Sequence, residues 1–148
     1  MTVDDVRAVA AGLPRAYEVL VHDRVKFRVG AIVFVAFSRD ETVMGFGFPK
    51  ADREMLVASD PDKFMLPGAT DMRFNWVCAR MAALDLAEMR ELVVDAWRMV
   101  VPKRVAAAWD EEHLEEMRRA AAGGGGPERS SRQGTPNSAA AGSGGGPV

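Results

Sequence analysis

The sequence has few of the residues that stabilise very small folds or bind metals. It contains a single cysteine, Cys78, which excludes an internal disulfide framework and a cysteine-based zinc site. No run of apolar residues reaches the roughly 18 that a membrane span requires. The first ten residues, MTVDDVRAVA, carry two aspartates instead of a basic cluster and an apolar run, which argues against a secretory leader. What remains is a chain of 148 residues with 19 basic and 21 acidic side chains, typical of one cytoplasmic domain.

Composition changes sharply after Ala122. Residues 123–148 read GGGGPERSSRQGTPNSAAAGSGGGPV and hold nine of the fourteen glycines and three of the eight prolines. Such a segment cannot bury enough apolar surface to offset the entropy lost on ordering it. The sequence therefore predicts one folded domain over residues 1–122 and a disordered tail over residues 123–148.

Hydrophobic periodicity predicts an α+β fold for the folded part. Helical spacing follows the N-cap residues Thr2 and Asp85 and resumes after Pro102, whereas residues 24–29 alternate with the period of a strand. The expected order is a helix over 2–12, strands over 24–29, 32–37 and 42–48, a helix over 49–59, a strand over 73–81, and helices over 85–100 and 103–120. We expect an antiparallel sheet of about four to five strands packed against helices.

Several positions in these elements carry more specific expectations. Gly30-Ala31 suits a two-residue hairpin turn, because glycine supplies the positive φ that a type II′ turn needs. Gly45 and Gly47 keep one face of the strand over 42–48 small, which favours close approach by a helix. The opposite face of that strand carries Met44, Phe46 and Phe48. In the helix over 49–59, Met55 and Leu56 are expected to point inward.

The sequence gives little support for catalysis. It contains no His-Glu-x-x-His, Gly-x-Ser-x-Gly or Gly-Lys-Ser/Thr motif. Cys78 lies in an apolar stretch typical of the core, and His113 stands among glutamates on an expected exposed helix face. His22 lies beside the basic strand and is the better functional candidate, although a strand-edge or capping role also explains it. We expect no catalytic residue, no metal and no cofactor.

The clearest polar feature is a basic row formed by Arg24, Lys26 and Arg28. On an extended strand these side chains share one face at intervals of about 6.6–6.8 Å. Consecutive phosphates of a nucleic acid repeat on a similar length scale, so the row can follow a phosphate backbone in a salt-dependent manner. The same alternation also solvates the outer face of a sheet and discourages edge pairing. Because the net charge is −2, only a local patch is consistent with nucleic-acid binding.

The order of short motifs along the chain resembles the MmcQ/YjbR family of small bacterial proteins. The motifs are Gly12-Leu13-Pro14, Val25-Lys26-Phe27-Arg28-Val29-Gly30, Glu54-Met55-Leu56, Asp60-Pro61-Asp62-Lys63-Phe64, Asn75-Trp76-Val77, Asp95-Ala96-Trp97-Arg98 and Val101-Pro102-Lys103-Arg104. The resemblance as a whole spans roughly residues 2–110. The resemblance implies a YjbR-like or CyaY-like α+β fold of the double-wing kind, DNA binding, and no enzymatic activity.

The resemblance also bears on the site. The strand over 25–30 and the pair Lys103-Arg104 match family positions that bring basic side chains. The candidate DNA-binding residues are Arg24, Lys26 and Arg28 of the basic row, with Arg73, Lys103 and Arg104 as secondary contacts. Members often carry a glycine and a lysine where this chain has Ala31 and Ile32, and a basic residue within 43–48, where this chain has none. The alternative is a small protein-interaction or ligand-binding module without nucleic-acid function. Its binding surface would be the face of Met44, Phe46 and Phe48. Neither function involves a membrane.

Overall fold

The chain folds around an antiparallel sheet of six strands in the order β1-β2-β3-β4-β6-β5. The computed structural model describes residues 1–123, and the predicted tail lies outside them apart from Gly123. The elements are α1 (Val3–Ala10), β1 (Ala16–Val21), β2 (Arg24–Val29), β3 (Ile32–Phe37), β4 (Val43–Gly47), α2 (Arg53–Ser59), β5 (Phe64–Met65), η1 (Ala69–Asp71), β6 (Trp76–Arg80), η2 (Met81–Ala83), α3 (Leu86–Arg98), α4 (Lys103–Glu112) and α5 (Leu114–Gly123). The predicted α+β class is confirmed. The sheet has more strands than expected, because β1 and the short β5 were not predicted.

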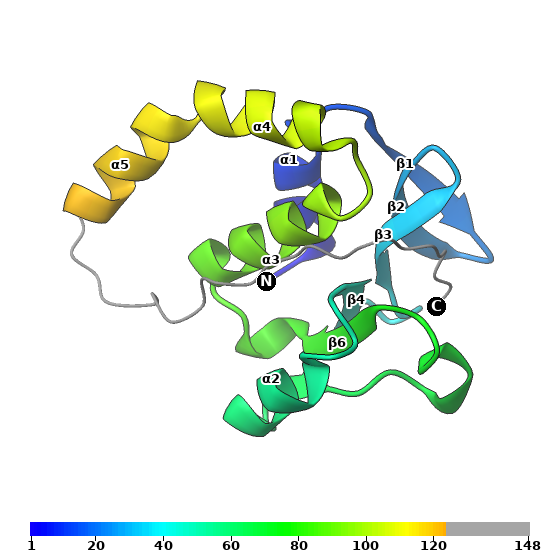
Figure 1. Ribbon diagram of the computed structural model, residues 1–148. Helices are drawn as coiled ribbons and strands as arrows, with labels where there is room; N and C mark the ends of the chain where they lie inside the picture. The colour runs from blue at the N-terminus through cyan, green and yellow to red at the C-terminus, as the bar shows by residue number, and fades with distance from the viewer. Residues whose placement is uncertain (124–148) are drawn as a thin grey trace.

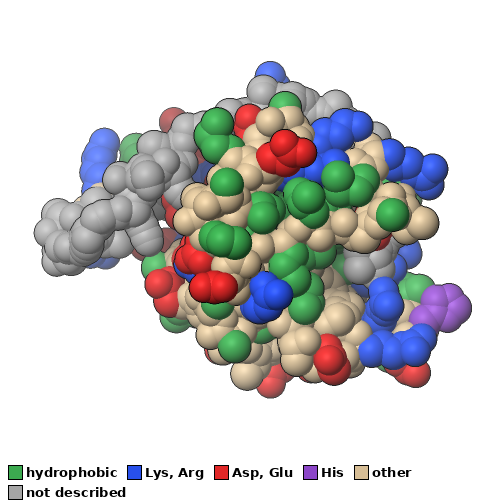
Figure 2. Space-filling view, turned by 90° about the horizontal axis from the view of Figure 1, so that it is seen from below, with side chains coloured by type: hydrophobic (Ala, Val, Ile, Leu, Met, Phe, Trp, Pro, Cys, Tyr) green, Lys and Arg blue, Asp and Glu red, His purple; other side chains and the backbone are tan. Residues whose placement is uncertain are grey.

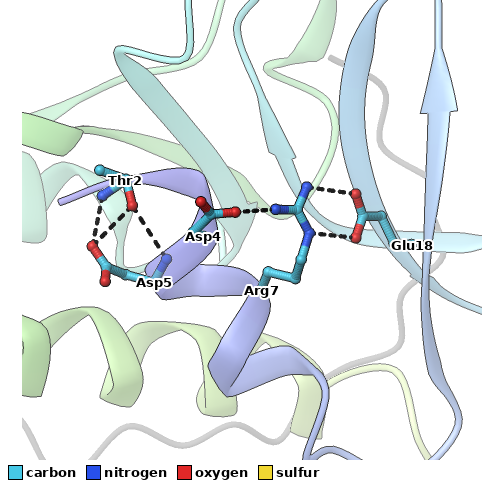
Figure 3. Close-up of polar contacts among 5 residues, drawn as sticks. All are labelled: Thr2, Asp4, Asp5, Arg7 and Glu18. Atoms are coloured by element: carbon cyan, nitrogen blue, oxygen red, sulfur yellow. Dashed lines mark hydrogen bonds and ion pairs between the residues drawn. The ribbon is translucent and has the colours of Figure 1, made fainter.

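Helix α1 begins at the predicted cap. The backbone N–H of Asp5 donates to Thr2 Oγ1 at 3.3 Å, and the N–H of Thr2 donates to the Asp5 carboxylate at 2.9 Å, which forms a capping box (Figure 3). Arg7 then fastens α1 to β1, since its Nε and Nη2 each donate to a Glu18 carboxylate oxygen at 2.8 Å. It also contacts Asp4 of its own helix. The Arg7–Glu18 ion pair therefore fixes α1 beside the β1 edge of the sheet.

One face of the sheet forms the core, which α1 and α3 cover (Figure 1). Strand register brings Phe27, Val35, Phe46 and Val77 into one row across β2, β3, β4 and β6, and all four are buried. Burying a side chain of this size stabilises the fold by about 1.5–3 kcal/mol relative to leaving it exposed. The core therefore defines an inner face of the sheet and leaves an opposite, outer face.

Two tryptophans connect the C-terminal helices to the turn between α1 and β1. The indole N–H of Trp97 donates to the carbonyl of Pro14 at 2.9 Å, and that of Trp109 donates to the carbonyl of Gly12 at 3.3 Å. The two rings lie 5.6 Å apart, so α4 packs on α3 through the same pair. Segments more than eighty positions apart in sequence thus meet at one point.

The last predicted helix is divided into α4 and α5 at His113. This residue was expected to be exposed, but its ring stacks on Trp109 with centroids 4.0 Å apart and is half-buried. Its Nδ1 also lies 2.8 Å from the Trp109 carbonyl oxygen. Contact with the indole explains the correction, because a stacked ring loses its exposure to solvent.

Helix α2 starts later than predicted and has a different buried face. Residues 49–52 form a turn, in which the Asp52 N–H donates to the Pro49 carbonyl at 3.0 Å. Met55, expected to point inward, is 79% exposed, while Arg53 is only 6% exposed. The reason is polar: the Arg53 guanidinium donates to three backbone carbonyls of the segment that precedes and begins β6. Leu56 packs against the core as expected.

Candidate nucleic-acid interface

Strand β2 presents the basic row on the outer face of the sheet. Val25 and Phe27 are buried in the core, whereas Arg24, Lys26 and Arg28 are half-buried on the opposite side. The predicted alternation of this strand is therefore confirmed. The three cations lie about 6.6–6.8 Å apart along the strand.

Tight turns at both ends of β2 fix its position. Gly30 has φ of +61°, so the hairpin prediction for Gly30-Ala31 is confirmed. At the other end, His22 and Asp23 have φ of +53° and +65°, the signs required at the two central positions of a type I′ turn. His22 is thus a turn residue at the tip of the β1–β2 hairpin.

Strand β1 adds an apolar lane beside the basic row. In the antiparallel register Tyr17 lies opposite Arg28, Val19 opposite Lys26, and Val21 opposite Arg24. Cross-strand partners share a face of the sheet, so the two rows lie side by side on the outer face. The Tyr17 hydroxyl donates to the Gly30 carbonyl, and the side chain is 45% exposed.

Tyr17 is the residue of this face that the sequence reasoning missed. Its strand lacks clean alternation, since Val19, Leu20 and Val21 are consecutive apolar residues. The two residues His22-Asp23 separate two strand-like runs, which is the spacing of a β-hairpin. That spacing predicts β1 and thereby the position of Tyr17 beside β2.

The remainder of the outer face is covered by side chains from β6 and the segment before it. Val33, Ala36 and Trp76 form a second buried cluster, with Phe74 and Cys78 packed against it. The indole of Trp76 lies over Gly45, where an added Cβ would stand 2.6 Å from Nε1. The predicted close neighbour of Gly45 was a helix, so this prediction is corrected: a flat indole fills the space. Of the two glycines, only Gly47 faces a helix: a Cβ added there would stand 3.7 Å from the Ala96 Cβ of α3.

Electrostatic repulsion acts within the basic row. Burial lowers the pKa of Lys26 below its ordinary value, and the neighbouring Arg24 and Arg28 lower it further, against an opposing effect of Asp71. Within residues 1–123, neither Lys26 nor Arg28 forms an ion pair. The Nε of Arg28 is buried without a hydrogen-bond partner among the described residues. An anion placed on the row would offset this repulsion.

Arg73 lies in the segment before β6, on the same outer face of the sheet as the basic row. Its guanidinium stands over the Phe74 ring at 4.8 Å, and Phe74 packs on the outer-face cluster. Lys50 Nζ and Arg53 donate to backbone carbonyls of this segment. Figure 2 shows several Lys and Arg side chains at the side of the molecule on which β1 and β2 lie in Figure 1.

Lys103 and Arg104 are not brought to this face. They are exposed at the N-terminus of α4, in the helical layer that packs through Trp109 on Trp97 of α3. The six candidate residues therefore divide into an outer-face group of four and a separate pair on α4.

The surface required by the protein-interaction alternative lies in the core. Met44 and Phe46 are fully buried, and Phe48 packs against the same cluster with its ring 6.3 Å from that of Phe46. Met44 and Phe46 are therefore inaccessible to a partner in the folded domain, and Phe48 is half-buried beside them.

The candidate catalytic residues do not meet. Cys78 on β6 is separated from β2 by β3 and β4, three strand spacings of about 4.8 Å or about 14 Å, and His22 lies at the far tip of the β1–β2 hairpin. Burial, with Asp71 nearby, raises the pKa of the Cys78 thiol to about 11, which keeps it protonated at neutral pH. No three metal-ligating side chains gather within the described residues. No helix among them is long and apolar enough to cross a bilayer.

These features define a small α+β domain with a helix-covered inner sheet face and a cationic strand on the outer face. The chain belongs to the YjbR family, whose model matches residues 11–99. The predicted family resemblance is therefore confirmed. The fold is also similar to the crystal structure of the Deinococcus radiodurans protein DR2400, which contains a DUF419 domain. The TM-score is 0.60 at 20% identity, over 75% of this chain and 86% of that one. No curated protein matches the chain.

Proposed function

We propose that this protein is a non-enzymatic DNA-binding domain that contacts phosphates through the basic row of β2. The observation that carries the proposal is the row itself: three cations on one open sheet face, close enough to repel one another. Phosphates of a DNA backbone would reduce that repulsion and release condensed counterions. Arg24 and Arg28 add planar forks that can bond phosphate oxygens in pairs.

Contacts of this kind position a protein on DNA and carry little sequence information. Strand β2 meets the backbone with side chains spaced along a line, and Arg73 offers a further cation from the segment beside it. The binding we propose is therefore weakly sequence-specific and strongly dependent on salt.

The test is fluorescence anisotropy of labelled DNA titrated with the full chain. Three phosphate contacts predict a slope of about −2.7 in log K against log salt on a duplex, or about 40-fold weaker binding at 200 mM than at 50 mM. Failure to bind at the lower salt concentration contradicts the proposal.

The decisive variant is Arg24→Glu/Lys26→Glu/Arg28→Glu, which we expect to abolish binding. Its matched control reverses three exposed arginines elsewhere, namely Arg39, Arg90 and Arg118. Both variants change the net charge equally, so an equal loss of binding in the control refutes a role for the row in particular. Circular dichroism of each variant establishes that it is folded.

The pair on α4 is tested separately with Lys103→Glu/Arg104→Glu. Because it lies in the helical layer, we expect this variant to retain most of the affinity. A loss as large as that of the row variant would move the interface to α4.

A further inference from the structure

The outer face has two parallel lanes of different chemistry. The basic row runs along β2, and Tyr17, Val19 and Val21 run along β1 beside it, one residue opposite each cation. Neighbouring strands lie about 4.8 Å apart. An apolar lane is therefore available within one strand spacing of every cation in the row.

The aromatic member of the apolar lane is held in place. The Tyr17 hydroxyl donates to the Gly30 carbonyl, at the turn that ends β2, so the ring is anchored at its far end. The ring nevertheless remains 45% exposed. A fixed and accessible aromatic ring loses little conformational entropy when another ring stacks on it.

We propose that this face binds single-stranded DNA, with phosphates on the basic row and a base stacked on Tyr17. The inference rests on the proposed function and specifies its ligand. In a single strand the bases are unpaired and lie to one side of the phosphates, so one strand can occupy both lanes. In a duplex the base faces are stacked inside, and the apolar lane has nothing to contact. Basic grooves with aromatic platforms are a general solution for single strands.

Tyr17 is the only tyrosine in the chain, which permits a direct readout. The full chain is produced with ring-labelled tyrosine and titrated with a 20-residue oligothymidine, or with a duplex of equal length. Stacking of a base shifts the Tyr17 ring resonances upfield with the single strand and leaves them unchanged with the duplex. Anisotropy on the same two probes gives the affinities.

Three substitutions complete the test. Tyr17→Ala is expected to weaken single-strand binding by about fivefold or more, the range measured for removal of a stacking ring, and to leave duplex binding unchanged. Tyr17→Phe keeps the ring and is expected to retain most of the affinity, which separates stacking from loss of the hydroxyl anchor. Leu20→Ala is the matched control, because Leu20 is 69% exposed on the same strand but on its other face.

The outcomes separate the two proposals. Preferential single-strand binding with shifted Tyr17 resonances supports the inference. Equal binding of both probes with unshifted resonances, while reversal of the basic row still abolishes binding, overturns the inference and leaves the proposed function intact. No binding of either probe at low salt overturns both.

Discussion

Arg53 offers the sharpest test of how the outer face is built. Its guanidinium, 6% exposed, is the one charged group buried among the described residues. Nη1 donates to the carbonyls of Phe74 at 2.8 Å and Trp76 at 3.2 Å, and Nη2 donates to that of Met72 at 2.5 Å. We predict that Arg53→Met, which keeps an apolar stem and removes all three bonds, destabilises the fold and loosens this segment.

The magnitude follows from the three bonds. A hydrogen bond contributes about 1 kcal/mol net of desolvation, and more when one partner is charged. Removing three of them predicts a loss of about 3 kcal/mol in the free energy of unfolding. For a chain of this size, that corresponds to a fall of about 10 °C in Tm. Arg53→Lys should recover only part of the loss, because an ammonium group cannot reproduce the planar fork of the guanidinium.

Urea unfolding monitored by circular dichroism measures the free energy of unfolding, and hydrogen exchange measures how far the segment bound by Arg53 is loosened. Exchange should accelerate in residues 69–76 more than in β2. The control is Arg90→Met, an exposed site on α3 where we expect a change within about 0.5 kcal/mol. Arg53→Met with a stability within that range, or with unchanged exchange in residues 69–76, would refute the role assigned to Arg53.

Four further predictions follow. Gly45→Ala places a Cβ 2.6 Å from Trp76 Nε1 and should cost about 1–3 kcal/mol in urea unfolding; a neutral result would mean that the indole relocates freely. Asp71→Asn should tighten DNA binding by up to about fivefold, because it removes a carboxylate that opposes the basic row; unchanged anisotropy titrations would contradict this. Cys78 should resist alkylation at neutral pH, as mass spectrometry can check. The ion pair with α1 lowers the pKa of Glu18, so its stabilisation is present above the ordinary carboxyl pKa and disappears as pH falls through the lowered value. The stability difference from Glu18→Gln should therefore vanish in acid, and a constant difference would exclude that linkage.

Local signals in the sequence predict the elements whose cause is local. The cap at Thr2, the cap at Asp85 and the positive φ of Gly30 each depend on one residue and its neighbours, and all three are confirmed. The alternation of β2 is equally local, because each of its faces meets a uniform environment. It is for this reason that the basic row can be identified without a structure.

Features that depend on pairing between distant segments are not predictable in this way. The burial of Arg53 cannot be predicted from its neighbours in sequence, because the three carbonyls to which it donates belong to residues 72–76. The same holds for Tyr17, whose place beside Arg28 results from strand register rather than from spacing along the chain. The outer face therefore becomes a two-lane surface only when β1 and β2 pair.

The two indole hydrogen bonds have a consequence for the order of folding during synthesis. Strands β1 to β4 are consecutive neighbours, so their hairpins can close as soon as each strand has been made. The carbonyls of Gly12 and Pro14, in contrast, accept hydrogen bonds from Trp109 and Trp97, which lie 97 and 83 positions later in the chain. The bonds that fasten this first turn to the C-terminal helices can therefore form only after almost all of the domain has been synthesised, whereas strands β1 to β4 can pair before the helices cover the inner face of the sheet.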